Sequence, residues 1–79
     1  MRTRVYRTNG EQTDAVYYEV VLVEDDGLEI VDACLDEAPA LAMALATSTL
    51  ATRPEGSMPT YDCLHGDRIA EFANGKRLI

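Results

Sequence analysis

No lysine or arginine occurs from residue 8 to residue 52 of this sequence. Proteins that bind nucleic acid or anionic membranes neutralise phosphates with clustered Lys and Arg. This absence and the formal net charge of −7 therefore argue against direct binding to DNA, RNA or an anionic membrane. The same negative field should attract proteins with basic surfaces.

Cysteine and histidine are also scarce, being limited to Cys34, Cys63 and His65. Two cysteines in a chain without an apolar leader predict free thiols rather than a disulfide framework. Cys63 and His65 share a face of one predicted strand, but their spacing matches no common zinc module. Since no hydrophobic run approaches the ~20 residues of a membrane span, we expect a cytoplasmic protein, in the host cytoplasm if a phage encodes it.

Acidic residues are abundant in the cation-free region, but their spacing fits no metal or catalytic motif. An EF-hand loop with Gly27 at its sixth position would begin at Leu22 and end at Ala33, neither of which is a carboxylate. Paired catalytic carboxylates need a cleft, which a 79-residue domain barely provides. We therefore expect no metal site, no cofactor and no catalytic residue, and enzyme is the least favoured class.

Alternating apolar residues predict a β-hairpin early in the chain. Residues 15–24 alternate and are rich in β-branched and aromatic side chains, which is typical of a strand. Asp26-Gly27 is a type I′ turn signal, and residues 28–35 form the return strand. One apolar face then contains Val16, Tyr18, Val20 and Leu22, with Leu22 beside Val31, Val20 beside Ala33 and Tyr18 beside Leu35.

A helix is predicted over residues 36–53, with Asp36 as N-cap and Pro54 and Gly56 ending it. We expect a stripe of 3.6-residue period to lie on the sheet: Ala38, Leu41, Ala42, Leu45, Thr49 and Leu50. The opposite side is small and uncharged: Ala40, Ala44, Thr47, Ser48 and Ala51. This second side either faces water or meets another chain.

The C-terminal part predicts a second hairpin, residues 60–65 and 68–73, turned at Gly66-Asp67. Asn74-Gly75 is a further turn signal. Residues 2–8 fit an additional N-terminal edge strand that turns at Asn9-Gly10. The prediction is a single α+β domain of residues 1–79, ββαββ at its core, with one helix packed on an antiparallel sheet. Its core alone would supply only ~3–5 kcal/mol, so self-association is a natural source of added stability.

The charge pattern itself suggests the function. Acids on alternate strand residues repeat at roughly 6.8 Å, which is a phosphate-like spacing. Ordinary solvated surfaces interleave charges of both signs, whereas this region does not. We therefore expect a nucleic-acid-like row that contacts a basic protein partner. The candidate partner-binding residues are Glu19, Glu24, Asp25, Asp26, Glu29, Asp32, Asp36 and Glu37.

The order of YYEVVLVEDDG…EIVDACL, EAPALAMALATSTLA and YDCLHGDRIAEF resembles small phage-encoded anti-CRISPR proteins that inhibit type I effector complexes. This resemblance implies a non-enzymatic inhibitor that binds a Cas subunit or the whole effector complex.

The order from VVLVEDDG to DEAPALAMALA also resembles the partial RNase H-like fold of HicB-type antitoxins, of which DACLDEAP keeps a Cys and an Asp. A homodimeric structural or assembly protein, joined through the face of Ala40, Ala44, Thr47 and Ala51 or through sheet edges, is the other alternative.

Overall fold

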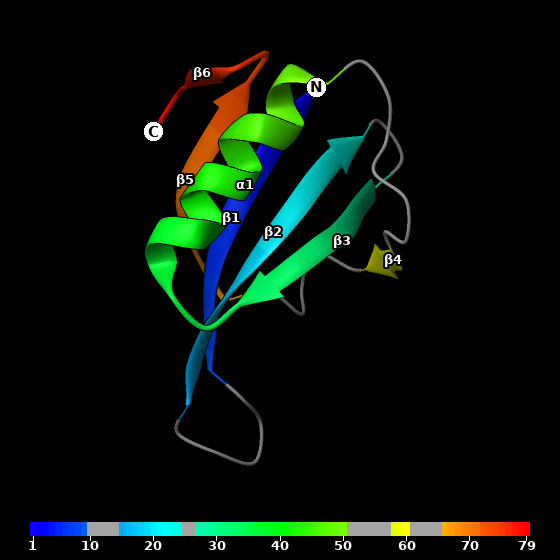
Figure 1. The fold of residues 1–79 in the computed structure, drawn as a ribbon. Helices are drawn as coiled ribbons and strands as arrows, with labels where there is room; N and C mark the ends of the chain where they lie inside the picture. The colour runs from blue at the N-terminus through cyan, green and yellow to red at the C-terminus, as the bar shows by residue number, and fades with distance from the viewer. Residues whose placement is uncertain (10–14, 25–26, 51–57, 61–65) are drawn as a thin grey trace.

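The computed structural model describes residues 1–9, 15–24, 27–50, 58–60 and 66–79. Its elements are β1 (Arg2–Asn9), β2 (Val16–Glu24), β3 (Gly27–Cys34), α1 (Glu37–Thr49), β4 (Met58–Thr60), β5 (Asp67–Ala73) and β6 (Lys76–Arg77). The strands form one antiparallel sheet in the order β4-β3-β2-β1-β5-β6. Helix α1 lies across one face of this sheet (Figure 1). The predicted α+β class is therefore confirmed.

The N-terminal strand lies in the middle of the sheet, so its predicted edge position is wrong. β1 pairs with β2 on one side and with β5 on the other. Thr3 and Val5 on its helix-facing side are fully buried. The side chains of Arg2 and Arg4 lie on the opposite side of the sheet, where both donate hydrogen bonds to the carboxylate of Glu71 in β5. The exact ββαββ core order is not confirmed, because the described elements run β1-β2-β3-α1-β4-β5-β6.

The β2–β3 hairpin is present, but its register differs from the prediction. Glu24 pairs with Gly27, and Leu22 pairs with Glu29 instead of the predicted Val31. A β-bulge between Val20 and Val21 shifts the register again, which leaves Tyr18 opposite Cys34. The predicted apolar face is kept only in part. Tyr18, Val20 and Val31 contribute to the core under α1, but Ala33 and Leu35 are exposed and Cys34 packs against the core instead. Asp25 and Asp26 lie outside the described residues.

Helix α1 packs with the side opposite to the one predicted. Ala40, Ala44, Thr47 and Ser48 are buried against the sheet, whereas Leu45 and Leu50 are 41% and 48% exposed. Leu41 is the member of the predicted stripe that does pack, partly buried, against the core. The small side chains let the helix approach the strands closely, and the Thr3 hydroxyl donates to the Ala44 carbonyl at 2.8 Å. Larger core residues come from the sheet instead: Val5, Val20 and Phe72. A dimer through Ala40, Ala44 and Thr47 is thus ruled out, while Ala51 lies outside the described residues.

The C-terminal end of α1 meets the N-terminus and the β5–β6 turn (Figure 1). The helix ends at Thr49, earlier than the predicted residue 53. The Met1 ammonium donates to the Ser48 carbonyl at 3.1 Å, which places a positive charge at the negative end of the helix dipole. The predicted Asn74-Gly75 turn is confirmed, with φ values of 51° and 81°. At the other helix end Asp36 holds the predicted N-cap position without a side-chain capping bond.

The predicted second hairpin does not appear in the described pairings. Residues 68–73 do form a strand, as part of β5, but its partners are β1 and β6. Thr60 belongs to β4, which pairs with β3 at the far edge of the sheet. Residues 61–65 lie outside the described residues. Among the residues that the structure describes, no helix is long and apolar enough to cross a membrane.

Candidate protein-binding site

The eight acidic residues predicted to bind a partner do not form one continuous surface. Side chains alternate between the two faces of a strand, so acids on the same strand can lie on opposite faces of the sheet. Glu19 falls on the face of the sheet away from α1, where it is only 6% exposed and accepts a hydrogen bond from the Thr8 hydroxyl at 3.0 Å. Its carboxylate therefore has a role within the sheet, between β1 and β2.

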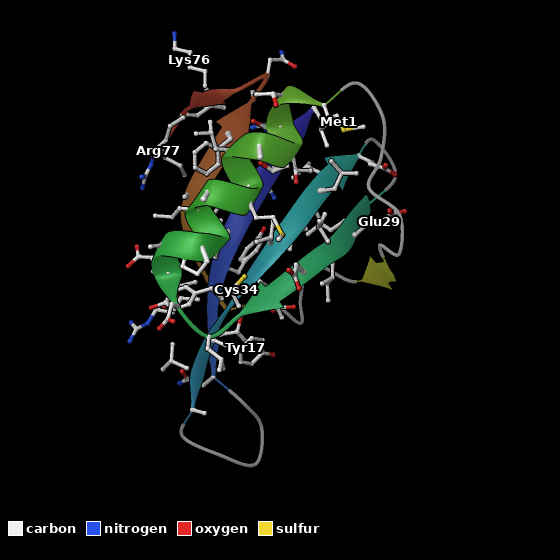
Figure 2. The ribbon with its side chains drawn as sticks, in the orientation of Figure 1. Met1, Tyr17, Glu29, Cys34, Lys76 and Arg77 are labelled. Atoms are coloured by element: carbon white, nitrogen blue, oxygen red, sulfur yellow. The ribbon has the colours of Figure 1, made fainter. Side chains whose placement is uncertain are left out.

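Glu24 and Glu29 lie near the hairpin end of β2 and β3, and both are half-buried. Figure 2 shows Glu29 and Cys34 toward opposite ends of β3. The five residue steps between them span roughly 17 Å at ~3.4 Å per residue. Glu29 is therefore distant from the acids that follow Cys34, and the predicted row is interrupted.

The remaining acids gather where β3 ends and α1 begins. We call this surface the acidic corner and define it as Asp32, Leu35, Asp36 and Glu37. All four side chains are exposed, and Leu35 is 80% exposed. The Asp32 carboxylate accepts from the backbone N–H of Ala33 at 2.8 Å. Within the described part of the chain, none of the three acids forms an ion pair with Lys or Arg, so their charges remain available to a partner.

Local structure explains why the acidic corner is exposed. β3 leaves the sheet after Cys34, and α1 starts at Glu37, so residues 35 and 36 connect a strand to a helix. A connection this short cannot fold Leu35 back onto the core. Glu37 lies in the first turn of α1, where a negative charge interacts favourably with the helix dipole. The same geometry that stabilises the helix start therefore keeps the acids on the surface.

Cys34 is a half-buried free thiol that packs against the core under α1. Burial raises its pKa above the ordinary 9.0, and the nearby Asp32 and Asp36 charges raise it further. The thiol therefore stays protonated at neutral pH, which makes it a poor nucleophile. Cys63 and His65 lie outside the described residues, and within the described ones no three His, Cys, Asp or Glu side chains gather as a metal site.

A second charged feature, which the sequence analysis missed, is positive. We call it the arginine cluster: Arg2, Arg4 and Arg68 around the buried carboxylate of Glu71. Arg2 donates to both Glu71 oxygens at 3.1 Å, and Arg4 donates to Oε1 at 2.6 Å. Burial alone would raise the pKa of Glu71, but the hydrogen bonds from Arg2 and Arg4 outweigh it and lower that pKa. The spacing of Arg2, Arg4 and Tyr6 along one strand face was the available signal.

Comparison with protein-family models, with curated proteins and with solved structures found no match for this chain. Its function is therefore argued from its own surfaces. The acidic corner offers unpaired charge around an exposed leucine, and the arginine cluster occupies a different face of the sheet. The two features are separate.

Proposed function

We propose that this chain is a small acidic binding protein that inhibits a nucleic-acid-handling partner by covering a basic surface, and that it acts without catalysis. The observation that supports this proposal best is the acidic corner. Its three acids are exposed, and they lie within three residues of a leucine that is 80% exposed. Such a combination suits a basic partner with an apolar contact at the centre of the interface.

The two kinds of residue in the acidic corner contribute differently to binding. Exposed acids steer encounter with a basic surface and set specificity more than affinity. Leu35 supplies affinity, because burying a leucine side chain gains about 1.5–3 kcal/mol. Asp36 and Glu37 need not break an ion pair within the described chain before they meet a cation. Within the described chain, no Lys or Arg therefore competes with a partner's cations for the carboxylates of the acidic corner.

Nucleic-acid mimicry remains part of the proposal in a reduced form. Asp32, Asp36 and Glu37 lie around a strand-to-helix turn instead of along one extended strand face. The contact we propose thus depends on matched charge and an apolar anchor, and it does not require an evenly spaced phosphate-like row. Because the sequence resembles type I anti-CRISPR proteins, purified type I effector complexes are the first partners to test.

The test is competition with target DNA for a purified effector complex, followed by gel shift. The wild-type chain should displace DNA, and Asp36→Lys should raise the concentration needed by about tenfold, equal to roughly 1.4 kcal/mol. Leu35→Ser should also weaken competition. Asp67→Lys is the matched control, since Asp67 is an exposed acid of β5 outside the acidic corner. Thermal melts confirm that each variant is folded.

Different outcomes contradict different parts of the proposal. If the wild-type chain leaves DNA binding by a panel of type I complexes unchanged, these complexes are not the partner. If it competes but Asp36→Lys and Asp67→Lys behave alike, the acidic corner is not the contact surface. Loss of inhibition at raised salt for both the wild type and Asp67→Lys would agree with the electrostatic part of the mechanism.

A homodimeric assembly protein is the second candidate, and the exposed side of α1 is the observation that favours it. Leu45 and Leu50 are 41% and 48% exposed there. From Ala38 to Leu50 the helix contains no charged residue. Light scattering distinguishes the candidates, because an obligate dimer keeps twice the chain mass on dilution. A dimer that weakens on Leu45→Lys would support assembly through this side.

A further inference from the structure

The arginine cluster holds more positive charge than its carboxylate neutralises. Arg4 and Glu71 are direct cross-strand partners in β1 and β5. Tyr6, two residues further along β1, is paired with Arg68 beyond a register shift. The Arg68 guanidinium lies 3.9 Å from the same Glu71 oxygen that Arg2 and Arg4 contact. Within the described residues, Glu71 is the acid that these three guanidinium groups contact.

The layering of the arginine cluster determines what an approaching molecule meets. The Glu71 side chain is 7% exposed, whereas those of Arg2 and Arg68 are 51% and 43% exposed. Arg4 is intermediate at 19%, and its Nη1 also donates to the Tyr6 hydroxyl at 3.1 Å. The carboxylate thus lies beneath the guanidinium groups and orients them. A ligand reaches positive charge first.

Spare hydrogen-bond donors remain in the arginine cluster. A guanidinium has five N–H donors, and Arg2 uses Nε and Nη2 on Glu71. Arg68, at 3.9 Å, is an ion-pair neighbour beyond hydrogen-bonding distance. Glu19 lies beside Tyr6 in the register and accepts from Thr8, while the Ile79 oxygen that meets the Glu71 backbone N–H accepts from Arg77 Nε, which lies outside the arginine cluster. Three arginines against these two acids still leave a net positive charge.

We propose that the exposed guanidinium groups of Arg2 and Arg68 bind a phosphate-type oxyanion. Planar guanidinium forks match the geometry of phosphate oxygens, and Arg4 and Glu71 hold the underlying framework. The overall charge of −7 opposes anions at long range. At physiological ionic strength the Debye length is about 8 Å, so distant acids are screened while the arginine cluster acts at contact.

The direct test is an NMR titration with inorganic phosphate, with sodium chloride adjusted to keep ionic strength constant. The Nε–Hε resonances of Arg2 and Arg68 should shift and saturate. The double variant Arg2→Gln/Arg68→Gln should bind phosphate at least about tenfold more weakly, since two charge-assisted contacts are lost. Arg77→Gln is the matched control, because Arg77 is exposed on β6, lies over the Phe72 ring and donates to the Ile79 carbonyl oxygen instead of the Glu71 carboxylate.

The double variant keeps Arg4 and Glu71, so it should fold, and a thermal melt checks this. Phosphate shifts that appear equally on Arg77, or that persist unchanged in the folded double variant, would overturn the proposal. An oligo-dT arm distinguishes the source of the anion. Tighter binding of oligo-dT than of phosphate identifies a phosphodiester backbone, and preference for free phosphate identifies a small anion. Absence of binding by either probe also overturns the proposal.

This inference is independent of the proposed inhibitory function. Asp36→Lys alters the acidic corner at the β3–α1 connection, whereas the arginine cluster lies on β1 and β5. Asp36→Lys should therefore leave the phosphate titration unchanged. Competition for an effector complex should likewise persist in Arg2→Gln/Arg68→Gln. Failure of one proposal is thus distinguishable from failure of the other.

Discussion

Single residues that the sequence presents as simple surface charges have distinct structural roles in this protein. Glu71 is 5% exposed as a residue and joins β1 to β5 through the arginine cluster. Glu19 similarly joins β2 to β1 through Thr8. Asp36, by contrast, sits at the helix start with no side-chain bond. The net charge alone does not distinguish these roles, and burial does.

Glu71→Gln should lower the free energy of unfolding by about 1–3 kcal/mol at pH 7, because Arg4 is left partly buried without a carboxylate. The pH dependence follows from the lowered pKa of Glu71. The folded state then binds this proton less tightly than the unfolded state, so the stabilisation is complete above the ordinary value of 4.5. It is lost as the pH falls through the lower folded-state pKa.

Urea denaturation of the wild type and Glu71→Gln from pH 7 to pH 3 measures both effects. The difference between the two chains should be largest at neutral pH and should shrink in acid. Glu37→Gln provides the control, since Glu37 is exposed and makes no ion pair within the described chain. Equal stability of Glu71→Gln and the wild type at pH 7 would mean that the arginine cluster contributes nothing net.

At the scale of elements, local sequence patterns were enough to predict where most strands and the helix lie, but not which strands pair with each other. Predicted strands 15–24 and 28–35 correspond to β2 and β3, and predicted helix 36–53 begins one residue before α1. The alternation of apolar and polar residues, turn residues and capping residues are signals that extend over only a few positions, so they can be recognised in the sequence. The pairing of β1 with β5 joins residues about seventy positions apart, as in the Arg2–Glu71 bond, and no local pattern encodes it.

The orientation of α1 could not be predicted by placing its largest apolar residues inside. Phe72, Val5 and Val20 already fill the core from the sheet, and only small side chains fit between them and the helix axis. The arrangement of the candidate binding site was equally difficult to predict from the sequence. The acids at positions 32, 36 and 37 were identified from sequence, but the separation of Glu19 and Glu29 from them required the register and the bulge.

Helix orientation gives a paired prediction at this scale. Ala44→Leu places extra methyl groups where Ala44 is fully buried beside Val5 and Thr3, and overpacking of this kind costs about 1–3 kcal/mol. Ala46→Leu, on the exposed side of the same helix, should change stability by less than about 0.5 kcal/mol. Urea denaturation of both variants compares them directly. The reverse order would favour the Leu41–Leu45 stripe as the buried side.

Across the whole molecule, charge is segregated instead of balanced. Residues 8–52 contain ten acids and no Lys or Arg, while the first seven residues contain three arginines. Two of those arginines, Arg2 and Arg4, are held by Glu71 from β5, so they do not neutralise the acidic region. Like charges confined in a compact chain repel one another and lower its stability. The folded protein should therefore be sensitive to ionic strength.

Raising sodium chloride from 20 mM to 300 mM should stabilise the protein by about 1 kcal/mol, equal to roughly 4–8 °C in Tm for a chain of this size. Screening weakens repulsion among the many acids more than it weakens the single hydrogen-bonded arginine cluster. The variant Asp36→Asn/Glu37→Gln removes two negative charges and should gain less from salt, as measured by thermal melts followed by circular dichroism. A Tm that falls with added salt would contradict this, and would show that the ion pairs around Glu71 outweigh the repulsion within the acidic region.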